Sequence, residues 1–234
     1  MRLREVIKDL PKPMAPVAGR PFLEYLILQL AKFGINDIVL SVGYKKELIK
    51  SYFRSGESLG VNISYSEEDE PLGTGGAIKK AAQLIDDESM IAMNGDSFLD
   101  LNFDDFISFY KNTGVRAALA LAYVEDTARY GRVETGENSV IKSFSEKGQS
   151  GSGLINSGVY LFSRDVINGI AKGNVSVESD VFPGLVNQGL CGMSVKGFFI
   201  DMGLPEDYLK VSQHAEILNY AAGIHHNEAH KLEY

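Results

Sequence analysis

Two aspartates in this 234-residue chain stand beside glycines and follow short apolar runs. Asp96 follows the turn Asn94-Gly95, and Asp201 follows the apolar run 198–200. In α/β folds ligands bind where the carboxyl ends of parallel strands meet. Two carboxylates suit a hard ion such as Mg²⁺ when phosphate oxygens complete its coordination. The pattern therefore predicts a Mg²⁺ site at Asp96 and Asp201, and turn capping is the alternative for either aspartate alone.

A glycine-rich segment, 70–77, has the sequence EPLGTGGA and separates an apolar run from an amphipathic one. This order predicts a strand, a turn and a helix that starts at Ala77. Glycine has no Cβ, so its backbone N–H groups can approach a flat or charged ligand closely. A steric turn without a ligand is the alternative. The candidate nucleotide-binding residues are Leu72, Gly73, Thr74, Gly75 and Gly76, with Asn94 and Gly95.

Two lysines are candidates for binding phosphate. Lys12 lies between two prolines, which stiffen its backbone and limit the entropy lost on binding. Glu146 and Lys147 follow an expected strand and offer a second cation. For each lysine, a solvated surface position is the plainer interpretation.

Polar residues that suit a sugar occur further along the chain. Asn156 opens a strand-like run, and its amide can bind hydroxyl groups, while Gly158 allows close approach. Glu178 and Asp180 lie on one face if their segment is extended. They can accept hydrogen bonds from a sugar, or cap a helix that follows them.

Composition limits the classes of function. A net charge of −8 argues against nucleic-acid binding, and 44% hydrophobic residues fit an ordinary globular domain. No apolar run is long enough to span a membrane, and no signal peptide or disulfide is expected, so we expect a cytoplasmic protein. His226 and His230 flank Glu228, but this spacing differs from that of zinc proteases.

The order of elements predicts an α/β fold with a Rossmann-like mixed, mainly parallel sheet and helices on both faces. Helices are expected near 22–33, 45–53, 77–85, 166–170 and 205–222. Strands are expected near 37–42, 61–65, 90–94, 117–123, 132–134, 140–144, 155–162 and 193–200. The chain reads as one domain, with a nucleotide-binding half at 1–115, a sugar-phosphate half at 116–208 and a terminal helix and tail at 209–234.

Six short motifs occur in an order that resembles the sugar-1-phosphate nucleotidyltransferase family. In chain order the motifs are PKPM (11–14), LGTGGA (72–77), NGD (94–96), FSEK (144–147), NSGVY (156–160) and IDMG (200–203). The resemblance covers nearly the whole chain. The form PLGTGGA most resembles the guanylyltransferases that act on heptose or mannose 1-phosphates.

The resemblance implies a role for each matching residue. Arg2, Lys12 and Asp96 would be catalytic, and Asp96 and Asp201 would bind Mg²⁺. The glycine segment would bind the base of an NTP, with GTP favoured. Lys147 with Glu146 would hold the sugar phosphate, and Asn156 and Glu178 would hold sugar hydroxyls. The implied reaction joins a nucleotide to a sugar 1-phosphate and releases pyrophosphate, without nucleic acid or membrane partners.

One part of the family pattern is missing. An opening strand and a Gly-Gly-x-Gly-Thr-Arg loop should precede Leu3, and only Met1-Arg2 stand there. Loss of a central strand would expose the edges of its neighbours. We expect a recorded start downstream of the true one. The alternatives are a sugar-nucleotide-binding protein without full activity, or a uridylyl- or thymidylyltransferase. The oligomeric state stays open, with a homo-oligomer among the possibilities.

Overall fold

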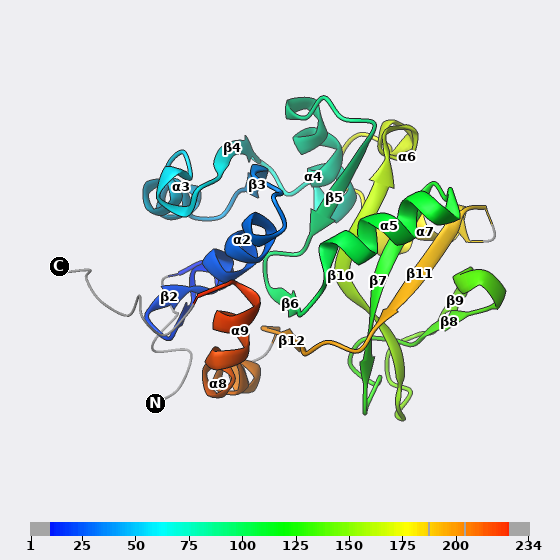
Figure 1. Cartoon of the computed structure of the whole chain (residues 1–234). Helices are drawn as coiled ribbons and strands as arrows, with labels where there is room; N and C mark the ends of the chain where they lie inside the picture. Colours follow the sequence, from blue (N-terminus) through cyan, green and yellow to red (C-terminus); the bar gives the residue numbers. More distant parts are fainter. Residues whose placement is uncertain (1–9, 187, 204, 225–234) are drawn as a thin grey trace.

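The computed structural model describes residues 10–186, 188–203 and 205–224 (Figure 1). Its largest sheet has four strands in the order β11-β7-β10-β5. β10 is antiparallel to both its neighbours and β11 is parallel to β7, so three strands share one direction. The strands are β5 (Ser89–Met93), β7 (Ala117–Val124), β10 (Gly153–Ser163) and β11 (Leu190–Val195).

A second unit is built on the parallel pair β3 (Asp37–Val42) and β4 (Asn62–Glu67). Parallel strands need a crossover, and here it contains α3 (Lys46–Phe53). α2 (Phe22–Lys32) precedes this pair in the chain and α4 (Gly73–Ala81) follows it. Figure 1 shows this unit on the left and the four-stranded sheet on the right.

Three short antiparallel pairs and the remaining helices complete the described fold. The pairs are β1 (Pro16–Val17) with β2 (Arg20–Pro21), β6 (Ser97–Leu99) with β12 (Phe199–Asp201), and β8 (Val133–Thr135) with β9 (Ile141–Phe144). The helices are α5 (Phe103–Thr113), α6 (Arg164–Gly169), α7 (Phe182–Leu185), α8 (Pro205–Gln213) and α9 (Ala215–Ala221), with 3-10 turns that include η1 (Lys12–Met14) and a π-helical turn, η5 (Val177–Val181). In the described residues, every helix is too short or too polar to span a bilayer.

The expected strand 193–200 is wrong, because the chain forms two strands there in different sheets. β11 ends at Val195, and β12 pairs with β6 instead. Gly197 allows the crossing, since a Cβ on it would lie 1.9 Å from the carbonyl oxygen of Asp100. Local apolar character could not reveal this change of partner, which depends on a residue almost a hundred positions away.

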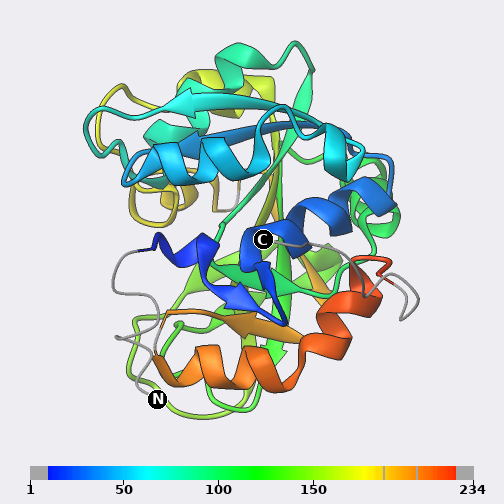
Figure 2. The same cartoon turned by 90° about the vertical axis from the view of Figure 1, so that its left-hand side faces the viewer.

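The expected single helix 205–222 is also divided in two. The break is at His214, whose backbone leaves the helical region with φ −108° and ψ 21°. The His214 ring stacks on Phe198 at 5.1 Å, and α9 packs against α2. Figure 2 shows α8 and α9, in orange and red, turning around this face of the molecule.

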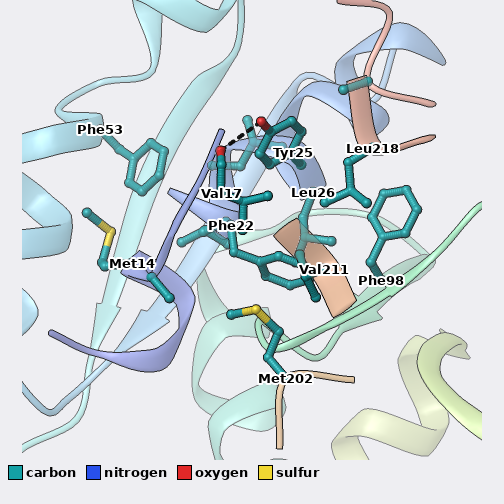
Figure 3. Close-up of a cluster of buried hydrophobic side chains, with 14 of the residues drawn as sticks. Met14, Val17, Phe22, Tyr25, Leu26, Phe53, Phe98, Met202, Val211 and Leu218 are labelled. Carbon is teal, nitrogen blue, oxygen red and sulfur yellow. Dashed lines mark hydrogen bonds between the residues drawn. The ribbon is translucent and has the colours of Figure 1, made fainter. Parts of the chain in front are cut away.

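A buried apolar cluster joins the N-terminal and C-terminal parts of the described chain (Figure 3). Phe22 of α2 and Phe98 of β6 are fully buried, and so are Val211 of α8 and Leu218 of α9. The Tyr25 hydroxyl donates to the carbonyl oxygen of Val17 at 2.9 Å. The cluster therefore places β6 and the end of β12 against the helices that precede and follow them.

An apolar cavity of about 240 Å³ lies between β3 and β5 and reaches α2 and α4. Among the described residues, β3 pairs only with β4, and β5 pairs only with β10. Apolar strand residues that face the cavity, such as Leu40 and Ile91, are only partly buried. β3 and β5 therefore each turn one edge without a partner strand, among the described residues, toward this cavity.

Filling this cavity should stabilise the fold. Ala81 lines it from α4, so Ala81→Leu adds apolar volume where space exists. We expect the free energy of unfolding to rise by about 1–2 kcal/mol. Ala118→Leu is the control, because Ala118 of β7 is fully buried and lines no part of this cavity. Overpacking there should lower the unfolding free energy by about 1–3 kcal/mol. Urea denaturation of both variants measures the effects, and a destabilised Ala81→Leu would contradict the prediction.

An ion pair network fastens α3 to β4. Glu67 accepts hydrogen bonds from Lys50 Nζ at 2.6 Å and pairs with Lys46 Nζ at 2.8 Å. These bonds, from Lys46 first and Lys50 next, lower the pKa of Glu67 from its ordinary 4.5 to about 2. Ionised Glu67 therefore stabilises the folded state above about pH 4.5.

This contribution should disappear as the pH falls from about 4.5 toward 2, because the unfolded state then binds the proton first. Glu67→Gln should unfold more easily than the parent protein at neutral pH and lose that difference at low pH. Thermal melts across this range test the expectation. Glu125→Gln is the control, since Glu125 is exposed and has no ion pair with any described residue. An equal pH response in both variants would refute the assignment.

Candidate functional site

The pairing of β6 with β12 brings Asp96 and Asp201 together. Asp96 immediately precedes β6, and Asp201 is the last residue of β12, opposite Ser97. The backbone N–H of Met202 donates to the carbonyl oxygen of Asp96 at 2.8 Å. Two carboxylates 105 positions apart in sequence thus lie on adjacent strand ends, as the Mg²⁺ prediction requires.

The surroundings of Asp201 affect the pKa of its carboxyl group. Burial, and then the charge of Asp96, raise the pKa of Asp201 above its ordinary value, while Arg129 opposes the shift. No group of three or more potential His, Cys, Asp or Glu ligands exists among the described residues. A hard cation here would therefore need phosphate or water oxygens besides the two aspartates. The donor set fits Mg²⁺ held between protein and a phosphorylated substrate.

Arg129 is a charged neighbour of Asp201 that is absent from the residues predicted from the sequence. Its Nη1 and Nη2 donate to the two carboxylate oxygens of Asp207 at 3.0 and 2.8 Å, and Nη2 lies 3.4 Å from Asp201 Oδ2. Asp207 is buried near the start of α8, where this bidentate pair compensates its charge. Nothing in the sequence spacing links Arg129 to residues more than 70 positions later.

Lys12 stands beside the Asp96 turn. It is exposed at the start of η1, and among the described residues no carboxylate pairs with it. The next residue, Pro13, contacts the turn, because a Cβ on Gly95 would lie 3.4 Å from the Pro13 ring. The proline-flanked segment that carries Lys12 therefore packs against the turn Asn94-Gly95-Asp96.

Gly158 has a different role from the one expected. Its φ is +80°, and a Cβ there would lie 2.6 Å from Asn94 Nδ2. The carbonyl oxygen of Gly158 accepts from the backbone N–H of Asn94 at 2.8 Å. The close approach that glycine permits is therefore to Asn94. It joins the strand β10 to the turn that carries Asp96.

Tyr160 connects the two residues expected to bind sugar hydroxyls. Asn156 Nδ2 donates to the Tyr160 hydroxyl at 2.9 Å, and this hydroxyl donates to Glu178 Oε1 at 3.2 Å. Tyr160 is fully buried, and burial, and then the charge of Glu178, raise the pKa of its phenol. A phenol with a raised pKa stays protonated and keeps donating. Asn156 and Glu178 thus lie at the two ends of one hydrogen-bonded group.

The glycine-rich segment is packed against residues 173–177, and α4 starts at Gly73, four residues earlier than predicted. The backbone N–H of Gly75 donates to the Val175 carbonyl oxygen at 2.7 Å. A Cβ on Gly76 would lie 2.3 Å from the carbonyl oxygen of Gly173, and Gly73 has φ +66°. These glycines therefore allow backbone packing, and they are required whether or not a nucleotide base also contacts them.

Two predicted residues, Glu146 and Lys147, remain apart from this network. Glu146 and Lys147 are exposed in the turn after β9, and no hydrogen bond joins either side chain to a described residue. The turn itself is held by a bond of 2.7 Å from Gly148 N to the carbonyl oxygen of Ala128, next to Arg129. Arg2 lies outside the described residues.

Comparison with known proteins shows which family this chain belongs to. The family model described as nucleotidyl transferase matches residues 1–217, almost the whole chain. The chain belongs to the sugar-1-phosphate nucleotidyltransferase family. The family and the α/β fold class predicted from the sequence are therefore confirmed.

Several relatives in this nucleotidyltransferase family are named for their reactions. The D-glycero-alpha-D-manno-heptose 1-phosphate guanylyltransferase of Campylobacter jejuni is 41% identical over 208 residues, which cover 88% of this chain and 91% of the relative. The mannose-1-phosphate guanylyltransferase of Mycobacterium tuberculosis is 36% identical and matches 90% of this chain but 60% of its own length. Both relatives are guanylyltransferases.

Solved structures of nucleotidyltransferases share the fold. The crystal structure of HddC from Yersinia pseudotuberculosis complexed with GMP-PN has a TM-score of 0.80 and 33% identity, and the match covers 88% of this chain and 91% of that one. A glucose-1-phosphate thymidylyltransferase from Bacillus anthracis, described as putative in its name, has a TM-score of 0.79 at 21% identity. The second likeness shows the fold alone.

The close packing at the start of α4 can be tested with matched glycine substitutions. Gly76→Ala should lower the free energy of unfolding by about 1–3 kcal/mol, because its Cβ meets the backbone oxygen of Gly173. Gly169→Ala is the control, since nothing lies within 4 Å of a Cβ at that helix end. It should be neutral, or stabilising by up to about 1 kcal/mol. Equal stability of the two variants in urea denaturation would exclude the packing role.

Proposed function

We propose that this protein transfers GMP from GTP to a heptose- or mannose-type sugar 1-phosphate, releasing pyrophosphate. The placement of Asp96 beside Asp201, with the segment that carries Lys12 packed against the same turn, carries the proposal. Carboxylates that share a divalent ion suit a reaction between phosphates. The names of the guanylyltransferase relatives support GTP as the donor and favour catalysis over sugar-nucleotide binding alone.

The attacking group would be a phosphate oxygen of the sugar 1-phosphate, which is already an anion at neutral pH. It would attack the α-phosphorus of GTP in line with the leaving pyrophosphate, so no general base is needed. The difficulty is the repulsion of two anions brought together. Positively charged groups and accurate positioning are the means of overcoming this repulsion.

The chain's own residues would divide this work. Asp96 and Asp201 would hold Mg²⁺, which would neutralise phosphate charge when bound. Lys12 would contact the nucleotide phosphates, and its rigid segment would limit the entropy lost on binding. The segment 72–76, with Asn94 and Gly95, would lie against the nucleotide.

On the sugar side, Lys147 with Glu146 would reach the sugar phosphate from their exposed turn. Asn156 and Glu178, already joined through Tyr160, would bind sugar hydroxyls. Arg2 is proposed as a further phosphate contact on the basis of the family motif alone.

Pyrophosphate release from a panel of substrates tests the proposal. The panel pairs each of GTP, UTP, dTTP and ATP with heptose, mannose and glucose 1-phosphates, in the presence and absence of Mg²⁺. Release should be greatest with GTP and a heptose or mannose 1-phosphate, and it should depend on the metal. A preference for UTP or dTTP would change the assigned nucleotide. The absence of turnover with every pair would refute the proposed activity.

A second prediction isolates the metal site. Asp96→Asn should reduce turnover at least about a hundredfold, because an amide is a poor ligand for Mg²⁺, and should change the melting temperature little. Asp100→Asn is the matched control, since Asp100 follows β6 and lies outside the proposed site. It should retain turnover close to that of the parent enzyme. Near-normal turnover of Asp96→Asn would remove the metal assignment.

A further inference from the structure

The Thr74 hydroxyl makes both of its hydrogen bonds with the segment that carries Glu178. It accepts from the backbone N–H of Val177 at 2.8 Å and donates to Glu178 Oε2 at 3.0 Å. We propose that Thr74, although it lies in the predicted base-binding segment, is a positioning residue for the sugar. By this proposal it holds the Glu178 carboxylate ready for a sugar hydroxyl, and the inference rests on the proposed function.

The local turn does not need Glu178 for its own stability. Ser176 caps η5, since its hydroxyl oxygen accepts from the backbone N–H of Ser179 at 3.2 Å. Asp180 completes the cap by accepting from the backbone N–H of Ser176 at 2.8 Å. From the sequence alone, sugar binding and helix capping are both open for Glu178 and Asp180. This arrangement gives the capping to Asp180 and leaves the Glu178 carboxylate for another purpose.

The hydrogen bonds around Glu178 leave space for one more donor. Oε2 accepts from Thr74 and Ser176, each at 3.0 Å, and Oε1 accepts from Tyr160 at 3.2 Å. An ionised carboxylate has about four acceptor positions, so these three donors among the described residues leave about one for a ligand. That position is on Oε1, the oxygen shared with Tyr160. The carboxylate is therefore oriented before any sugar arrives.

Only a hydroxyl side chain can do what Thr74 does. It must accept from Val177 and donate to Glu178 with the same oxygen, which a serine can also do and a valine cannot. Both Thr74 and Glu178 are exposed, so their bond adds little to folding stability. Its effect should appear in binding, because an immobilised side chain loses less entropy when the sugar binds.

Calorimetry on the full chain can separate this role from nucleotide binding. The dissociation constant of the sugar 1-phosphate that turns over best is measured with Mg²⁺ and a saturating non-hydrolysable GTP analogue. The dissociation constant of the analogue is measured alone. Thr74→Val should raise the dissociation constant of the sugar 1-phosphate by about three- to tenfold. It should change the dissociation constant of the GTP analogue by less than about twofold. Thr74→Ser should restore the parent value.

A Glu178→Ala background completes the test. If Thr74 acts through Glu178, then Thr74→Val should cause no further loss of sugar binding once Glu178 is removed. Thr74→Ala replaces Thr74→Val if circular dichroism shows that the valine variant is unfolded. Weaker binding of the analogue alone, unchanged binding of both ligands, or a full effect in the Glu178→Ala background would overturn the inference. Failure of the parent protein to bind either ligand would instead count against the proposed function.

Discussion

The candidate site depends on one costly arrangement, the placement of Asp96 and Asp201 on adjacent ends of β6 and β12. Two partly buried carboxylates repel each other, and burial, followed by the charge of Asp96, raises the pKa of Asp201. The fold holds them through the β6–β12 pairing and the bond from Met202 to Asp96. Fully buried Phe98 ties β6 into the core. The energy of apolar burial thus stabilises a charge arrangement that alone would be unfavourable.

Backbone proximity, more than side-chain contact, organises the surroundings of the aspartates. Glycine at 76 and 158 lets chain segments approach to distances that a Cβ would forbid. Gly158 joins the Asp96 turn to β10 through Asn94, and the side-chain hydrogen bond of Tyr160 continues this path of contacts from β10 to Glu178. Close backbone contacts of this kind tolerate few substitutions. The candidate site residues are therefore held in place by glycines that have no side chain to take part in a reaction. This explains why glycine-rich motifs accompany the polar ones along the chain.

The same packing joins the two predicted halves of the site. The segment predicted to bind the base and the segment that carries Glu178 form one hydrogen-bonded unit through Thr74 and Val175. The conformation of each segment therefore depends on the packing of the other. Arg129 provides a comparable link between the Asp201 carboxylate and the start of α8 through buried Asp207.

The sequence alone was sufficient to predict the family, the fold class and most helices and strands. It also singled out Asp96 and Asp201 as candidate metal ligands. These follow from local periodicity and from short motifs in order, which depend on neighbouring residues. It could not reveal the division of 193–200 between two sheets, the break at His214 or the role of Arg129. Each of these depends on contacts between residues far apart in the chain. Tertiary structure also showed that Asp180 takes part in the cap of η5, and that Glu178 accepts a hydrogen bond from Thr74, more than a hundred positions earlier. Periodicity reports which face of an element is buried, whereas only packing determines what that face meets.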